Sequence, residues 1–252
     1  MKQLVDRKLE DIIGNKYLHA FYDVMSQIGE QYGPIIIKEG KKPFKKEICE
    51  RNYIIYISFI LGCLHGKEIL VRKEYINGEI TKHFEDYSDK AKEAYEKYKI
   101  MRNERTVSKN NNKKEEDSQF KQINVRPDFV IHDSHEEDYD TVGQKLVVEA
   151  KSTLYLDELD FCWDLMKLNF YLDKLKFQNC IYMIVNTSKA DIQKMINLYT
   201  EKFDYFSDDL SKLWFFVQNQ DKNKMLPLEL YQLSDQPTSE NCEVRSEIAY
   251  VE

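Results

Sequence analysis

Three charged residues stand in or beside short apolar runs, where an isolated charge is costly. Asp128 follows Pro127 at the start of one such run, and Glu149 and Lys151 lie within the next. Side chains alternate between the two faces of a strand, so Glu149 and Lys151 would share a face. If the two strands are neighbours in a sheet, Asp128 and Glu149 converge on one point with Lys151 beside them.

This combination of side chains suits one kind of chemistry. Two neighbouring carboxylates offer hard oxygen ligands to Mg²⁺ or Mn²⁺. Such a cation lowers the pKa of a bound water and offsets the negative charge of a phosphate group. A lysine beside it can orient the water or neutralise charge in the transition state. The three residues therefore predict hydrolysis of a phosphodiester bond.

The acid-x-lysine pattern itself is common in a charged chain. It also occurs at Glu39-Gly40-Lys41 and Asp6-Arg7-Lys8, but neither of these lies in an apolar run. Burying Glu149 and Lys151 without a role would be unfavourable. The alternative is a structural Glu–Lys pair at a strand edge, with Asp128 capping a turn.

Periodicity and turn residues predict the elements that would position these side chains. Helices are expected over 9–28 and 43–61 (ended by Gly62), 86–105, 157–175 and 189–203, and strands over 69–71, 80–84, 123–132, 145–152, 180–186 and 213–218. Asn77-Gly78 predicts a hairpin between the first two strands. The alternation of helices and strands predicts an α/β (mixed α+β) fold with a mixed sheet flanked by helices.

The distribution of apolar, polar and charged residues along the chain predicts its domain organisation. We expect an N-terminal helical segment over 1–34, one α/β domain over 35–233, and an acidic flexible tail over 234–252. Residues 106–120 form a polar insertion within that domain, expected to be a disordered linker.

The residues Pro127-Asp128 and Glu149-Ala150-Lys151 resemble the signature of the PD-(D/E)XK nuclease superfamily, which has the restriction-endonuclease-like fold. The resemblance implies an α-β-β-β-α-β core around a mixed sheet. It also implies Asp128 and Glu149 as metal ligands and Lys151 as the catalytic lysine. The motif covers 127–151, and the compatible element order extends it loosely over 43–186. The remaining segments match nothing in the family.

Many members of this superfamily carry a further glutamate on the first core helix. Within the helix predicted over 43–61, Glu50 falls among Ile54 and Ile57 on the apolar side, where an acid needs a partner. Glu50 is therefore the first candidate for an assisting catalytic residue, and Glu47 is the second. Glu47 is equally well explained as an acid that favours the dipole at a helix N-terminus.

Two groups of lysines are candidates for contact with a nucleic-acid backbone. A basic cluster precedes the first core helix and comprises Lys38, Lys41, Lys42, Lys45 and Lys46. Lys167 lies on the polar face of the helix predicted over 157–175, and that helix should pack close to the site. The alternatives are solubility charges for the cluster and a solvated helix face for Lys167.

Composition excludes several classes of protein. Of 252 residues, 42% are hydrophobic and 32% charged, which is typical of a soluble globular protein, and the longest apolar run is too short to span a membrane. The five cysteines are scattered without a CxxC pair, which favours reduced thiols and a cytoplasmic location. Neither a glycine-rich nucleotide-binding loop nor a serine-nucleophile motif is present. The net charge of −7 means that any contact with nucleic acid must be a local basic patch.

The sequence therefore predicts a cytoplasmic nuclease that depends on Mg²⁺ or Mn²⁺ and acts on DNA rather than RNA. Asp128 and Glu149 would hold the metal, Lys151 would position the water, and Glu50 would assist. Any sequence preference would come from the insertion, the N-terminal helix, a homodimer partner or a separate specificity or regulatory subunit. Association with the superfamily suggests restriction or phage defence, with repair and mobile-element processing as the other options. The alternative is a catalytically inactive nuclease-fold protein that binds nucleic acid or acts as a regulatory subunit.

Overall fold

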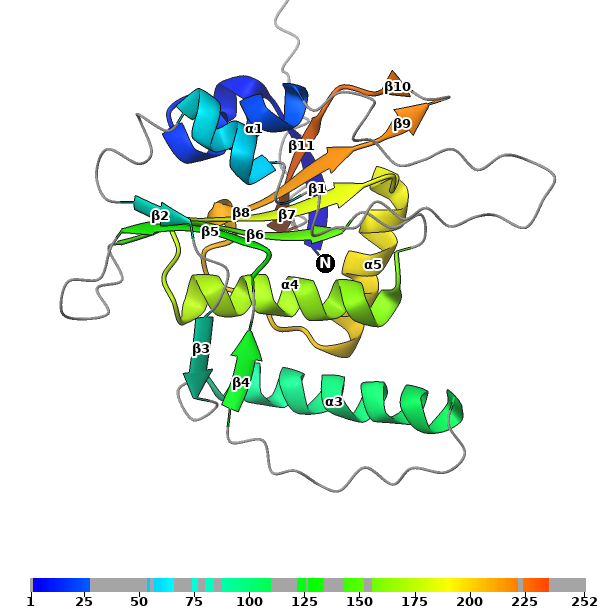
Figure 1. The fold of residues 1–252 in the computed structure, drawn as a ribbon. Coiled ribbons are helices and arrows are strands. Elements are labelled where there is room, and N and C mark those ends of the chain that lie inside the picture. The colour runs from blue at the N-terminus through cyan, green and yellow to red at the C-terminus, as the bar shows by residue number, and fades with distance from the viewer. Residues whose placement is uncertain are drawn as a thin grey trace, which may run out of the picture.

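A seven-stranded mixed sheet forms the centre of the protein, with helices on both of its faces (Figure 1). The computed structural model describes residues 2–27, 54, 57–65, 74–76, 80–83, 88–109, 122–125, 127–133, 143–151, 156–221 and 224–235. This arrangement confirms the predicted α/β class with a mixed sheet flanked by helices.

The central sheet has the strand order β1-β11-β8-β7-β6-β5-β2. Its strands are β1 (Lys2–Arg7), β2 (Glu74–Ile76), β5 (Phe129–Asp133), β6 (Gln144–Lys151), β7 (Asn179–Val185), β8 (Leu213–Gln218) and β11 (Glu229–Asp235). The three central strands β6, β7 and β8 are parallel, and the other neighbours are antiparallel. Two small sheets pair β3 (Ile80–His83) with β4 (Gln122–Val125) and β9 (Gln220–Asp221) with β10 (Lys224–Met225).

Four helices accompany the sheet, and residues 54 and 57–65 are also helical. They are α1 (Lys16–Gln27), α3 (Asp89–Lys109), α4 (Glu158–Asp173) and α5 (Lys189–Lys202), with short 3-10 turns at Leu9–Asp11 and Leu210–Lys212. The helices α4 and α5 make the crossovers that parallel neighbours require. Both lie with α3 on the face opposite α1 (Figure 1). No helix in the described part of the chain is long and apolar enough to cross a membrane.

The burial of each strand follows its position in the sheet. All seven residues of β7 are buried, because helices cover both faces of a central parallel strand. On the edge strand β1 only Leu4 is buried. In β6, Val147 packs in the core on the α4 side, whereas Val148 and Ala150 pack in the core on the α1 side. The predicted alternation along β6 is therefore confirmed, and Glu149 lies on the α4 side.

Two local predictions about the N-terminal half are wrong. The strand β3 pairs with β4, and β2 pairs with β5, so Asn77-Gly78 does not join two paired strands as a hairpin. Gly62 does not end its helix, which continues to His65. A Cβ at Gly62 would meet nothing within 4 Å, so this position places no conformational demand on the chain.

The edge strand β1 and its neighbour β11 do not match any predicted strand. The segment expected to be helical over 1–34 begins with β1, and the last strand, β11, extends into the start of the expected tail. These two strands pair with each other, from Lys2 opposite Asp235 to Arg7 opposite Leu230. Residues 236–252 and 110–120 lie outside the described residues, whereas 106–109, expected to belong to a disordered linker, are the last residues of α3.

Asp157 fixes the start of α4 and connects it to α3. Its Oδ1 accepts hydrogen bonds from the backbone N–H groups of Leu159 (3.0 Å) and Asp160 (3.2 Å), which caps the helix. The Arg105 guanidinium donates to both carboxylate oxygens, at 2.6 and 2.5 Å. Arg105 and these backbone donors lower the pKa of Asp157, although partial burial opposes them.

Two substitutions of Asp157 distinguish its role as a helix cap from its role in the ion pair with Arg105. We expect Asp157→Ala to lower the free energy of unfolding by about 1 kcal/mol, because two backbone donors lose their acceptor. Asp157→Asn keeps a capping oxygen and should lose clearly less. The pKa of Asp157 is lowered in the folded protein, so its ionised carboxylate stabilises the fold at neutral pH. This contribution to the free energy of unfolding is lost as the pH falls through the lowered pKa, so the difference between the wild type and Asp157→Asn shrinks at acidic pH. Urea unfolding at neutral and acidic pH measures both effects, and equal losses for the two variants would contradict the capping role.

Candidate active site

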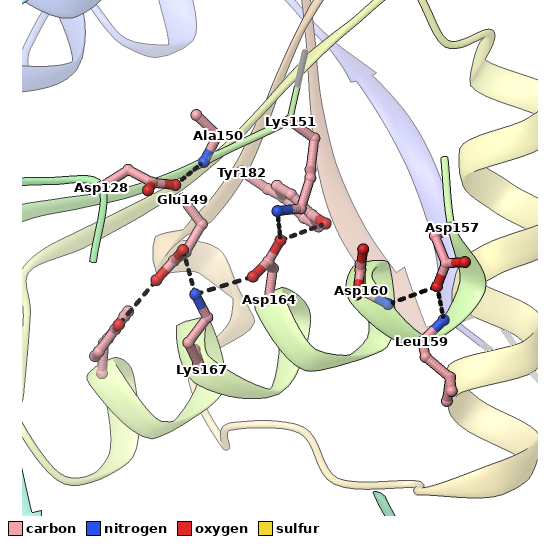
Figure 2. A network of polar contacts seen from close by, with 11 residues as sticks. Asp128, Glu149, Ala150, Lys151, Asp157, Leu159, Asp160, Asp164, Lys167 and Tyr182 are labelled. Carbon is pink, nitrogen blue, oxygen red and sulfur yellow. Dashed lines mark hydrogen bonds and ion pairs between the residues drawn. The ribbon is translucent and has the colours of Figure 1, made fainter. Parts of the chain in front are cut away.

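The pairing of β5 with β6 places Asp128 beside Glu149. Phe129 lies opposite Val148 in this antiparallel pair, and the Asp128 N–H donates to the Val148 carbonyl at 3.1 Å. The Asp128 Oδ2 in turn accepts a hydrogen bond from the Ala150 N–H at 2.8 Å. The carboxylate therefore takes the place of a backbone carbonyl at the end of the ladder. This contact fixes Asp128 next to Glu149, as Figure 2 shows.

Glu149 is the most deeply buried acid of the site, with 1% of its surface exposed. Its Oε2 lies 2.5 Å from the Lys167 Nζ. Its Oε1 accepts a hydrogen bond from the Tyr171 hydroxyl at 2.8 Å. Both oxygens of this carboxylate therefore have a partner on α4.

Asp164 joins the two lysines of the site. Its Oδ1 lies 2.9 Å from the Lys167 Nζ, and its Oδ2 lies 2.9 Å from the Lys151 Nζ. The Tyr182 hydroxyl donates to Oδ2 at a longer distance of 3.4 Å. Asp164 is itself 3% exposed. A continuous chain of polar contacts thus connects Glu149, through Lys167 and Asp164, to Lys151 (Figure 2).

The spacing of three residues on α4 explains why they meet this strand. Asp164, Lys167 and Tyr171 stand at positions i, i+3 and i+7, which places them on one stripe of a helix. All three are buried, so the alternative of a solvated helix face is wrong. Lys167 binds Glu149 rather than facing solvent. Asp164 and Tyr171 were not identified as site residues, although three polar residues at helical spacing in an apolar helix were a visible signal.

Burial and neighbouring charges shift several pKa values here. Burial raises the pKa of Asp128, against the hydrogen bond from Ala150. Burial also raises the pKa of Glu149 well above its ordinary value, and the Asp164 and Asp128 carboxylates add to this effect while Lys167 opposes it. Burial would lower the pKa of Lys167, but Glu149 and Asp164 together raise it. Three carboxylates surround two ammonium groups, so one negative charge is in excess when all are ionised (−3 + 2 = −1).

The structure brings together the three residues of the sequence motif. Asp128 and Glu149 lie next to each other across β5 and β6, and Lys151 is one of the two lysines bound by Asp164. Glu50 and Glu47 lie outside the described residues. The basic cluster of Lys38, Lys41, Lys42, Lys45 and Lys46 lies outside them as well.

The two carboxylates fit a hard divalent cation by their chemistry. Within the described ranges, no group of three or more His, Cys, Asp or Glu side chains is arranged to hold a metal ion. Mg²⁺ nevertheless keeps several waters and uses one or two carboxylates together with substrate phosphate. The contact between Asp128 and Ala150 uses only Oδ2. A carboxylate also has about four acceptor positions, so Glu149 retains acceptor capacity beside its two partners.

Comparison of the chain with protein-family models, with curated proteins and with solved structures found no match.

Replacing Lys167 should show how strongly the stability of the fold depends on the Glu149–Lys167 ion pair. We expect Lys167→Met to lower the free energy of unfolding by about 3–5 kcal/mol, because it leaves a buried carboxylate without its partner. Combining it with Glu149→Gln should recover most of that loss. Chemical denaturation of the two single variants and the double variant measures the coupling.

Lys194→Met is the matched control, because Lys194 pairs with Asp191 at the surface and 75% of its side chain is exposed. That variant should change the free energy of unfolding little. Strictly additive losses for Glu149→Gln and Lys167→Met would contradict a coupled buried pair.

Proposed function

We propose that this protein is a metal-dependent nuclease that hydrolyses phosphodiester bonds, with Asp128 and Glu149 as ligands of Mg²⁺ or Mn²⁺. The observation that carries the proposal is the hydrogen bond from the Ala150 N–H to Asp128, which anchors this carboxylate beside the buried Glu149. Lysine ammonium groups lie within the same network. Neighbouring acids and lysines at the end of two paired strands suit the binding of a cation and a phosphate.

The side chains of the site would have different roles in such a reaction. A bound Mg²⁺ or Mn²⁺ would lower the pKa of a water and offset phosphate charge. Lys151 keeps 19% of its side chain exposed, so its ammonium can donate to an attacking water or a phosphate oxygen. Lys167 is nearly buried and compensates the charge of Glu149. Lys151 is therefore the lysine that meets the substrate.

Element order supports the restriction-endonuclease-like version of this proposal. The helix at 57–65 precedes β2, β5, β6, α4 and β7, which is compatible with an α-β-β-β-α-β core if β3, α3 and β4 are an insertion between β2 and β5. DNA as substrate, a role in restriction or phage defence, and a cytoplasmic location stay predictions from the sequence. A homodimer or a separate specificity subunit as partner stays a prediction as well.

A cleavage assay tests the proposed activity. Purified protein is incubated with supercoiled plasmid, linear duplex, single-stranded DNA and RNA in Mg²⁺, Mn²⁺ or EDTA. We expect metal-dependent cleavage that Asp128→Asn and Lys151→Met each lower by about 10²-fold or more. The first variant would weaken binding of the metal, and the second removes an ammonium that would stabilise charge in the transition state. Lys189→Ala, which breaks an exposed pair with Asp6, is the control and should cleave normally. Cleavage that survives in EDTA, or in both site variants, would exclude this assignment.

A second candidate function is binding of nucleic acid without cleavage. The specific observation in its favour is that Lys167 and Tyr171 already engage both oxygens of Glu149. Terbium luminescence, excited through nearby tyrosines, reports on cation binding at the carboxylates. Binding that Asp128→Asn abolishes supports the nuclease. Salt-sensitive DNA binding without cation binding supports the second function, and the absence of both favours a regulatory subunit.

A further inference from the structure

Asp164 contributes a third carboxylate to a site that already has two, and it is buried, as Glu149 is. Its two oxygens contact different lysines, with Lys167 on Oδ1 and Lys151 on Oδ2, both at 2.9 Å. Only 4% of its side chain is exposed, compared with 19% for Lys151. Asp164 therefore provides a buried anchor for a lysine whose side chain is partly exposed.

Charge balance shows that Asp164 is not needed to neutralise Lys167. Lys167 already has Glu149 as an ion-pair partner at 2.5 Å. A third carboxylate raises the pKa of Glu149 further, so it opposes the ionisation of that residue. Asp164 is thus unfavourable for the ionised form of Glu149. Its burial is best explained by its second ion pair, with Lys151.

We propose that Asp164 is a positioning residue, which holds the Lys151 ammonium at the edge of the site and keeps it apart from Lys167. Without the Asp164 charge, Lys151 loses this ion pair, and its ammonium can move toward solvent or toward the carboxylates of Asp128 and Glu149, where it would compete with a cation. The catalytic value of this arrangement rests on the proposed nuclease function. The positioning of Lys151 does not rest on it.

Lysine labelling followed by mass spectrometry measures the positioning directly, without any assay of activity. In the wild-type protein we expect Lys151 to react with acetic anhydride several-fold more slowly than Lys194, which is 75% exposed. Asp164→Asn should raise the labelling rate of Lys151 by about five-fold, as the loss of an ordinary partly exposed ion pair would. Lys167 should stay protected, because Glu149 still binds it.

Asp160 provides the matched control, because it is an exposed acid one turn earlier on α4. Asp160→Asn should leave the labelling of Lys151 unchanged. If Asp164→Asn does not fold, Asp164→Glu retains the charge on a longer side chain and should label Lys151 at an intermediate rate. Wild-type labelling of Lys151 as fast as that of Lys194, or an unchanged rate in a folded Asp164→Asn, would overturn the proposal.

Kinetics then test whether the positioning serves catalysis. For a cleaving enzyme we expect Asp164→Asn to lower kcat by about 10²-fold with little change in KM, because a displaced Lys151 affects the reaction more than substrate binding. Asp164→Glu should restore part of kcat, and Asp160→Asn should match the wild type. If the wild type cleaves nothing, the proposed function fails while the labelling result still decides the role of Asp164.

Discussion

Burial of the Glu149 carboxylate constrains how the elements around it are arranged. The strand β6 lies inside the sheet, and 1% of Glu149 is exposed, so water cannot solvate its charge. The compensation comes from α4, through the Lys167 ammonium and the Tyr171 hydroxyl. A helix that lacked these two groups, or that was rotated about its axis, would leave a buried charge unpaired. The rotation of α4 against the sheet is therefore fixed by polar contacts as well as by apolar packing.

The same contacts would create a conflict between the stability of the fold and the proposed metal-dependent chemistry. Lys167 is the cation that stabilises Glu149 in the folded chain, yet a metal ion on Glu149 would compete for the same carboxylate. Asp164 would lessen this conflict, because it is a second ion-pair partner of Lys167, at 2.9 Å. Lys167 could therefore stay in place if a metal ion also bound Glu149. The folded site thus resembles a cation site in which a lysine supplies the positive charge. Sites that break a local rule, such as the burial of several acids, are often functional sites.

The sequence predicts the central elements well because their signals are local. β8 has the predicted bounds, and β7, α4 and α5 lie within two residues of them, since continuous apolar runs and the caps at Asp157 and Ser188 mark these elements. The edge strand β1 and its neighbour β11 escape prediction because both are largely polar, and β1 is stabilised by pairing with β11 across more than 220 residues. The wrong hairpin has a similar cause, since Asn77-Gly78 favours a turn but cannot specify which strands pair.

The candidate site, like the fold, is predicted only in part from the sequence. Alternation along β6 and the position of Asp128 predict that the motif residues converge, because both depend only on strand geometry. The role of Lys167 was beyond prediction from spacing. A helical wheel shows that Asp164, Lys167 and Tyr171 share a face, but not whether that face packs on solvent or on a strand that carries Glu149. Buried acids and lysines are rare enough that the solvated alternative was reasonable, and only tertiary packing distinguishes the two.

Asp128 combines a structural role with its place in the proposed chemistry, and these roles can be separated by the choice of substitution. Its Oδ2 completes the β5–β6 ladder by accepting from the Ala150 N–H. An alanine at this position removes both the charge and the acceptor, so the N–H loses its partner at the end of a buried strand. An asparagine retains an oxygen for Ala150 and removes only the charge. A defect shared by both variants therefore belongs to the carboxylate charge, whereas a defect confined to alanine belongs to the ladder.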